Sequence, residues 1–284
     1  MMKNKGIIAI NKPSGWTSFD VVNKLKYMLK PLKTGHLGTL DPMATGVLLV
    51  TVGKATKLFD LMQKKKKTYL AQFTFGYETD TLDSTGVVMS TTDIIPTEKQ
   101  IKQVLPMFIG KISQIPPKYS AKSINGARAY SLARQNIDFE LKPKVVDIYD
   151  IRFVSYINKI LTLSIECGSG TYIRAIGRDL AEKLNSKVTM TSLVRTKVDK
   201  FSIENCQDIH EINRDNVFDR ILPIQEFIDY PTLKVDAETH NKLLNGQKLQ
   251  INKNDGVYQL KDDADTLALV EIHENQAKMS VFLG

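Results

Sequence analysis

The chain has 284 residues, of which 42% are hydrophobic and 25% charged, a composition that suits a globular protein of one large domain or two smaller ones. Its formal charge of +8 favours a phosphate-rich partner, although many basic proteins merely carry a solvated positive surface. No apolar run reaches the roughly 18–20 residues of a membrane helix, and the N-terminus shows no secretory pattern. Two cysteines give no disulfide framework, so we expect a cytoplasmic protein, and four scattered histidines predict no metal site.

The first third of the chain alternates between strand and helix patterns. A strand over residues 6–10 ends in a turn cluster at 11–15. Thr17 or Ser18 can cap a following helix, whose apolar residues recur at helical spacing through 23–29. Strands are expected over 47–52 and 68–75, where apolar and β-favouring side chains dominate.

The remainder mixes both kinds of element and changes in style near residue 230. We expect helices over 97–107, 171–184 and 237–244, an extended segment over 116–121, and paired strands over 145–155 and 159–166. Short strands separated by glycine and asparagine follow, which predicts a catalytic unit over 1–230 and a β-rich module over 231–284. Strands and helices without a steady β-α-β rhythm indicate an α+β fold.

The loop Gly35–Gly46 holds a single acidic residue, Asp41, among three glycines, directly before the expected strand over 47–52. Asp41 precedes a proline, which is common in structural turns. The glycines permit close approach to a ligand, and functional groups often lie on loops held by a rigid sheet. An ionised carboxylate there can attack a sugar carbon, act as a general base or bind a ligand hydroxyl, and the loop alone does not decide.

Two further segments combine charge with glycine or an aromatic ring. Lys64–Lys67 precede Tyr69, which fits either a base-stacking platform or a solvated charge run leading into a strand. Gly168–Arg174 is a glycine-rich turn that opens a helix, without a Walker or dinucleotide-binding pattern. Arg174 fits a cleft in which it pairs with a carboxylate, or an ordinary surface ion pair.

Other polar residues give weaker signals. His36 reads as a polar loop residue and Leu193 as a buried aliphatic side chain. Asp80 and Asp83 offer a second carboxylate pair, which we interpret as a turn that pairs with basic residues.

Read together, these segments resemble the TruB-type tRNA pseudouridine-55 synthase family. The resemblance covers nearly the whole chain in order and lies in residues 12–18, 35–46, 67–69, 76–86, 116–121 and 170–174. It implies a pseudouridine synthase fold, with a mixed and largely antiparallel central sheet flanked by helices and a PUA-like C-terminal domain that contacts RNA. It also implies isomerisation of uridine 55 in the T-loop of tRNA to pseudouridine, without cofactor or metal. For the oligomeric state, a monomer is the default expectation.

The resemblance assigns roles residue by residue. Asp41 falls on the catalytic aspartate, and Arg174 on the arginine that pairs with it. Tyr69 falls on the tyrosine that stacks on the target base and helps to remove its C5 proton. Tyr172 and Leu193 fall on pocket positions around the flipped nucleotide, and His36 on a histidine that fills space vacated by flipped bases; these assignments rest on the family.

The chain departs from the family pattern at two positions. Family members usually carry a lysine where this chain has Ser123, with Lys122 one place earlier. They usually carry two arginines after the pocket leucine, and here Val194 replaces the first. Both departures bear on RNA contacts rather than on the reaction.

Overall fold

A computed structural model describes residues 4–120, 123–124, 127–135, 137, 139–262 and 265–284. The α-helices of the described residues are α1 (Ser18–Leu29), α2 (Phe59–Gln63), α3 (Glu98–Val104), α4 (Ala129–Arg134), α5 (Ile173–Lys183) and α6 (Ala237–Leu244). Short 3₁₀ turns are η1 (Gly53–Leu58), η2 (Leu105–Phe108), η3 (Ile203–Asn205) and η4 (Ile224–Glu226).

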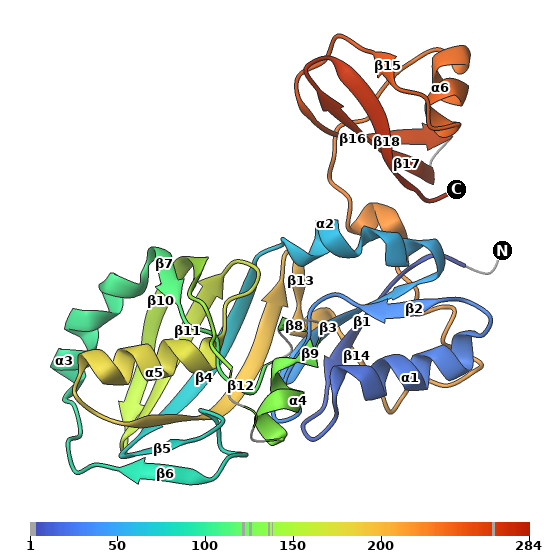
Figure 1. Ribbon diagram of the computed structural model, residues 1–284. Coiled ribbons are helices and arrows are strands. Elements are labelled where there is room, and N and C mark those ends of the chain that lie inside the picture. Colours follow the sequence, from blue (N-terminus) through green and yellow to red (C-terminus); the bar gives the residue numbers. More distant parts are fainter. Residues whose placement is uncertain (1–3, 121–122, 125–126, 136, 138, 263–264) are drawn as a thin grey trace.

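One large sheet organises the first part of the chain (Figure 1). Its strands are β1 (Gly6–Lys12), β2 (Thr34–His36), β3 (Thr45–Val52), β4 (Lys67–Phe75), β7 (Gly110–Gln114), β10 (Lys144–Ile157), β11 (Ile160–Cys167), β12 (Val188–Val198), β13 (Phe201–Ser202) and β14 (Gln207–Asp208). The strand order is β14-β1-β3-β12-β4-β11-β10-β7, with β2 paired to β3 and β13 to β12. The pairs β1·β14 and β3·β12 are parallel and the others antiparallel, so the predicted mixed, largely antiparallel sheet is confirmed.

The strand β3 lies at the centre of two cores. Val50 and Leu48 pack on one face with residues of α1, whereas Val47 and Leu49 pack on the other face with residues of η1 and η4. Burial on both faces explains why this strand reads as a continuous apolar run.

Helix α1 begins at one of the two predicted caps. Thr17 is the N-cap, and its side chain accepts a hydrogen bond from the main chain of Asp20, whose carboxylate accepts in return from the Thr17 main chain. This capping box starts the helix at Ser18. The predicted helix over 97–107 ends at Val104 and continues as η2, in which Pro106 lies.

Helix α5 crosses the face of the sheet beside β4 and β12 (Figure 1). The approach is close, because a Cβ atom built on Gly177 would lie 2.5 Å from the Phe73 ring. A glycine at this point therefore sets how near α5 comes to β4, and it fixes the height of the helix N-terminus above the sheet.

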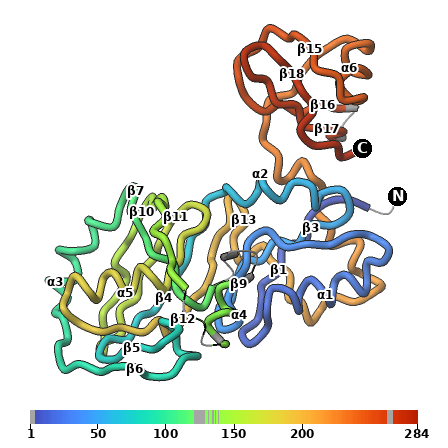
Figure 2. The backbone as a smooth tube through the Cα atoms, in the orientation of Figure 1, coloured from blue at the N-terminus to red at the C-terminus, as the bar shows by residue number. Residues whose placement is uncertain are grey.

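The end of the chain forms a separate four-stranded antiparallel sheet, in the order β15-β18-β17-β16. Its strands are β15 (Leu249–Gln250), β16 (Gly256–Asp262), β17 (Asp265–His273) and β18 (Gln276–Phe282), and α6 packs beside them. The backbone path in Figure 2 shows one connecting segment leading from the large unit into this module. The predicted β-rich C-terminal module is confirmed, and its boundary at residues 230 and 231 stays a prediction.

Two short hairpins complete the fold. They are β5 (Tyr77–Thr79) with β6 (Val88–Thr91), and β8 (Ser123–Ile124) with β9 (Ala127–Arg128). Lys122 and the side chain of Ser123 lie outside the described residues, so that departure from the family pattern stays untested. None of the helices in the described ranges is long and apolar enough to span a membrane.

Candidate active site

The loop that carries Asp41 is fixed by the start of α1. The Ser18 hydroxyl accepts a hydrogen bond from the Leu40 N–H at 2.8 Å and donates to the Leu40 carbonyl at 3.2 Å. The Ala44 N–H donates to the Asp41 carbonyl at 3.0 Å, and the side chains of Leu40 and Ala44 are buried. Asp41 is thus presented by an anchored turn immediately before β3.

Helix α5 brings Arg174 to this carboxylate. Its Nη2 lies 3.0 Å from Asp41 Oδ2, and its Nη1 lies 3.2 Å from Asp83 Oδ2. The same two nitrogens donate to the carbonyls of Thr81 at 2.8 Å and Tyr119 at 3.0 Å. Four acceptors around a planar fork leave the buried guanidinium a single orientation. The predicted pairing of Arg174 with a carboxylate is therefore present.

Asp83 is held as firmly as the arginine it contacts. Its Oδ1 accepts hydrogen bonds from the Thr81 hydroxyl at 2.8 Å and from the Thr85 N–H at 3.0 Å. Only 4% of its side chain is exposed, against 35% for Asp41. The two carboxylates share one guanidinium, but only that of Asp41 remains open to a ligand.

The surroundings of Asp41 act on its pKa in opposite directions. Burial raises the pKa of the Asp41 carboxyl above its usual range, Arg174 lowers it, Asp83 raises it, and Lys12 lowers it. The net direction is upward. Arg174 favours the ionised form of Asp41, but the effect of burial is larger.

Tyr69 and Leu193 lie on neighbouring strands of the sheet. In the pairing of β4 with β12, Tyr69 is opposite Arg195 and Leu193 is opposite Ala71. Tyr69 is 8% exposed and Leu193 is 6% exposed. Burial raises the pKa of the Tyr69 phenol, Arg195 lowers it, and the charge of Asp41 is near enough to raise it. The sheet thus places the tyrosine within electrostatic reach of Asp41.

The structure ties Tyr172 and His36 to the site more loosely. Tyr172 is the N-cap of α5, two residues before Arg174, and its main chain exchanges two hydrogen bonds with the Gln114 amide, at 2.8 and 3.1 Å. His36 ends β2, and its Nδ1 is buried without a hydrogen-bond partner among the described residues. Burial and the nearby Arg195 lower the pKa of its imidazole. Among the described residues, no hydrogen bond or ion pair joins either ring to Asp41.

Sequence reasoning missed three residues beneath or beside the loop. Asp83 was grouped with Asp80 as a turn that pairs with basic residues; Asp83 does so with Arg174, whereas Asp80 accepts from the Val87 N–H. Lys12 is completely buried, and its ammonium donates to the carbonyls of Pro13 and Pro42 among others.

Burial lowers the pKa of Lys12 to about 8. The position of this lysine next to a Pro-Ser-Gly turn could have drawn attention to it. The third missed residue, Arg195, is the second of the two arginines in the family pattern, but its partners Gly38, Thr39 and Val47 are brought to it only by the fold.

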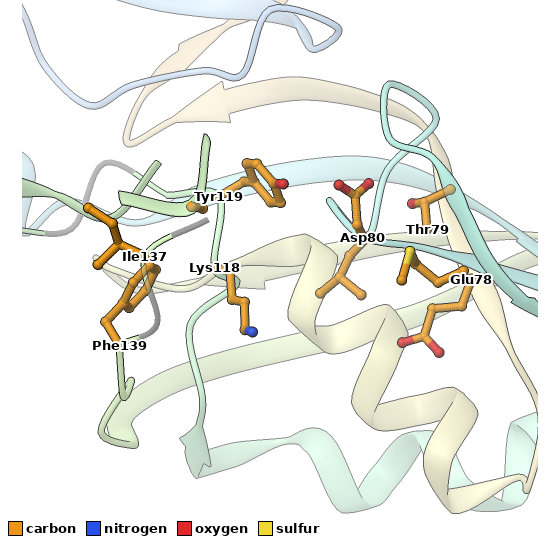
Figure 3. A pocket seen from close by; sticks show the side chains of 10 residues that line it. Glu78, Thr79, Asp80, Lys118, Tyr119, Ile137 and Phe139 are labelled. Atoms are coloured by element: carbon orange, nitrogen blue, oxygen red, sulfur yellow. The ribbon is translucent and has the colours of Figure 1, made fainter. Parts of the chain in front are cut away.

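A cavity of about 510 Å³ lies near the residues that hold Arg174 (Figure 3). Glu78, Thr79 and Asp80 line one side, and Lys118, Tyr119, Ile137 and Phe139 line another. The Tyr119 carbonyl accepts a hydrogen bond from Arg174, and so does the carbonyl of Thr81, the residue after Asp80. The cavity is thus connected to Arg174 through the main chain of its walls, and neither Arg174 nor Asp41 is among the described residues that line it.

Comparison with known proteins agrees with this arrangement. A family model described as TruB family pseudouridylate synthase (N terminal domain) matches residues 26–173. This chain belongs to the TruB family of pseudouridylate synthases. It is 40% identical over 272 residues to a tRNA pseudouridine synthase B of Clostridium kluyveri, covering 95% of this chain and 93% of that one. A protein of the same name from Caldanaerobacter subterraneus is 35% identical over 285 residues, covering 100% and 95%.

Solved structures support the fold. A chain in a Cbf5-Nop10-Gar1 complex superposes with a TM-score of 0.73 at 21% identity, covering 98% of this TruB-family chain and 84% of that chain. A second, from an H/ACA RNP bound to a substrate RNA containing 2'-deoxyuridine, gives a TM-score of 0.70 at 20% identity, with 98% and 84% covered. At these identities the likeness concerns architecture, and it confirms the predicted pseudouridine synthase fold.

Proposed function

We propose that this chain isomerises uridine 55 in the T-loop of tRNA to pseudouridine. The observation that carries the proposal is the Asp41–Arg174 ion pair, a carboxylate held by an anchored loop and still partly open to a ligand. Relatives that are 35–40% identical over nearly the full chain are named tRNA pseudouridine synthase B. The uridine position and the T stem-loop come from the family resemblance of the sequence.

The target base has to leave its stack before it can react. Extruding a base costs a few kcal/mol. Stacking on an aromatic ring is worth about 1–3 kcal/mol per base, so Tyr69 offsets much of this cost. Lysines such as Lys64 and Lys66 add contacts with phosphates. Tyr172, Leu193 and His36 have the roles that the resemblance gives them, around the flipped nucleotide.

The reaction then exchanges one bond to the ribose for another. The N1–C1′ bond breaks, the base turns, a C5–C1′ bond forms, the C5 proton leaves, and N1 ends with a proton, so mass is unchanged. Asp41 either attacks C1′ or removes the 2′ proton to give a glycal. Arg174 orients the carboxylate in both cases, and Tyr69 helps to remove the C5 proton. No step requires a metal or cofactor.

The rest of the molecule fits the same proposal. The C-terminal module at 231–284 would act as a PUA-like contact for RNA beyond the catalytic unit at 1–230. We also propose that the chain works as a cytoplasmic monomer, as expected from its sequence.

The test is incubation with a tRNA transcript labelled in its uridines, followed by nucleoside chromatography. Pseudouridine at position 55 supports the proposal. Free uracil with an abasic site would indicate an N-glycosidase, and bound but unchanged tRNA would indicate a folding chaperone; either result overturns it. Asp41→Asn should still bind tRNA but should not release tritium from C5, and turnover in this variant would remove Asp41 from its role.

A further inference from the structure

Arg195 is almost completely enclosed by the protein, although it carries a full charge. It is 1% exposed and lies on β12, the strand between β3 and β4. Among the described residues no carboxylate forms an ion pair with it, and its hydrogen bonds go to main-chain carbonyls. A buried charge without a counter-ion is unfavourable, so the presence of Arg195 at this position points to a specific role.

The carbonyls that Arg195 contacts belong to the loop in front of Asp41 and to the strand after it. Nε donates to the Val47 carbonyl at 2.7 Å, and Nη2 donates to the Gly38 carbonyl at 3.1 Å. Nη1 lies 3.5 Å from the Thr39 carbonyl, a weaker contact. One guanidinium thus joins the segment that leads to Asp41 with the strand that follows it.

The same residue faces Tyr69 across the sheet. Tyr69 and Arg195 are directly opposite in the pairing of β4 with β12, so their side chains leave the same face. The guanidinium charge lowers the pKa of the Tyr69 phenol, against the larger effect of burial. Arg195 therefore binds the main chain of the Asp41 loop and lies opposite the tyrosine on the neighbouring strand.

We propose that Arg195 is a positioning residue for the proposed isomerisation, which orients the Tyr69 hydroxyl relative to Asp41 by binding the Asp41 loop and the tyrosine at once. The inference rests on the proposed function. It assigns Arg195 no contact with RNA; its effect reaches the substrate through Tyr69 and the loop.

A double-mutant cycle tests the proposal. Arg195→Lys keeps the positive charge but loses the planar fork, and Tyr69→Phe removes the hydroxyl. We expect Arg195→Lys to lower the single-turnover rate of pseudouridine formation about tenfold in the otherwise unaltered chain, and less than threefold in the Tyr69→Phe background. Its affinity for tRNA should stay within about threefold, because no RNA contact is lost.

The control is Arg152→Lys on β10, where an exposed arginine pairs with Asp150 of its own strand, and its rate should not change. An equal loss of rate in both tyrosine backgrounds would overturn the proposal, and so would a loss that appears only as weaker tRNA binding. An unaltered chain that forms no pseudouridine would instead overturn the proposed function.

A second measurement leaves position 195 untouched, in case Arg195→Lys does not fold. The chain is labelled with ¹⁵N at the arginine guanidinium groups, and the signal that Asp41→Asn shifts is assigned to Arg174. Tyr69→Phe should then shift a different, slowly exchanging guanidinium signal, which we assign to Arg195. If every slowly exchanging guanidinium signal keeps its position in Tyr69→Phe, Arg195 does not hold the hydroxyl, and the proposal fails.

Discussion

Arg174 and Arg195 are both buried arginines near Asp41, yet they are held in opposite ways. Arg174 lies between two carboxylates and two carbonyls. Arg195 donates to main-chain carbonyls and lies opposite Tyr69, with no carboxylate partner in the described structure. The same type of side chain therefore has two different roles. Arg174 compensates charge at the site, whereas Arg195 joins segments of backbone.

The largest effect is expected from removing Arg174, which compensates the charges of Asp41 and Asp83. Arg174→Met leaves Asp41 and the buried Asp83 close together without their shared cation. Breaking a buried pair in this way costs about 3–5 kcal/mol, so we expect the free energy of unfolding to fall by that amount and pseudouridine formation to stop. Urea denaturation measures the first effect. In Arg152→Met, where the side chain is exposed, the change should stay within about 0.5 kcal/mol.

The next largest effect is expected where β3 and β12 approach each other, at Gly46 and Arg195. Gly46 has a φ of 101°, and a Cβ atom added there would lie 2.2 Å from the main-chain oxygen of Arg195. Gly46→Ala should therefore force β3 away from β12 and lower the free energy of unfolding by about 2 kcal/mol or more. Gly15→Ala is a useful control, because Gly15 also has a positive φ, of 83°, but open space around it. Equal losses in the two variants would show that backbone strain alone is responsible.

A smaller effect concerns pH. Asp83 raises the pKa of Asp41, and Asp83→Asn removes that charge, so the pKa of Asp41 should fall. A reaction that needs ionised Asp41 should then persist to lower pH than in the unaltered chain, although its rate at neutral pH should drop about tenfold because Arg174 loses an anchor. Single-turnover rates measured from about pH 4 to about pH 8, which spans the region above the usual pKa of an aspartate, report both effects. An acid limb that moves to higher pH would contradict this account.

The smallest expected effect is on the stability of Asp41→Asn. A carboxyl whose pKa is raised on folding favours the protonated form in the folded state, so its ionisation destabilises the fold as pH rises through the two pKa values. Replacing it by a neutral amide should therefore leave the melting temperature at pH 7 unchanged or slightly higher, while activity is lost. A clearly lower melting temperature would show that the Asp41–Arg174 pair stabilises the fold.

Asp41 and Arg174 could be predicted from the sequence better than the residues that surround them. The glycine loop and the glycine-rich start of α5 are local patterns, and both placed their residues correctly. Strand β12 was not predicted, because Thr189, Ser192 and Lys197 interrupt its apolar pattern; it is a strand because it fills the space between β3 and β4. Arg195 was missed for the same reason, since its partners are brought to it only by the strand order of the sheet.

One further contact shows how far from the reaction centre the site is determined. Gln114 ends β7, the outermost strand on its side of the sheet, and it is 1% exposed while its amide closes a two-bond ring with the main chain of Tyr172. Rim strands ordinarily tolerate substitution and risk joining other chains. Here the edge strand is instead tied to the start of α5, so a displacement of β7 would tilt the helix that delivers Arg174, and a substitution of Gln114 would disturb the site from a distance.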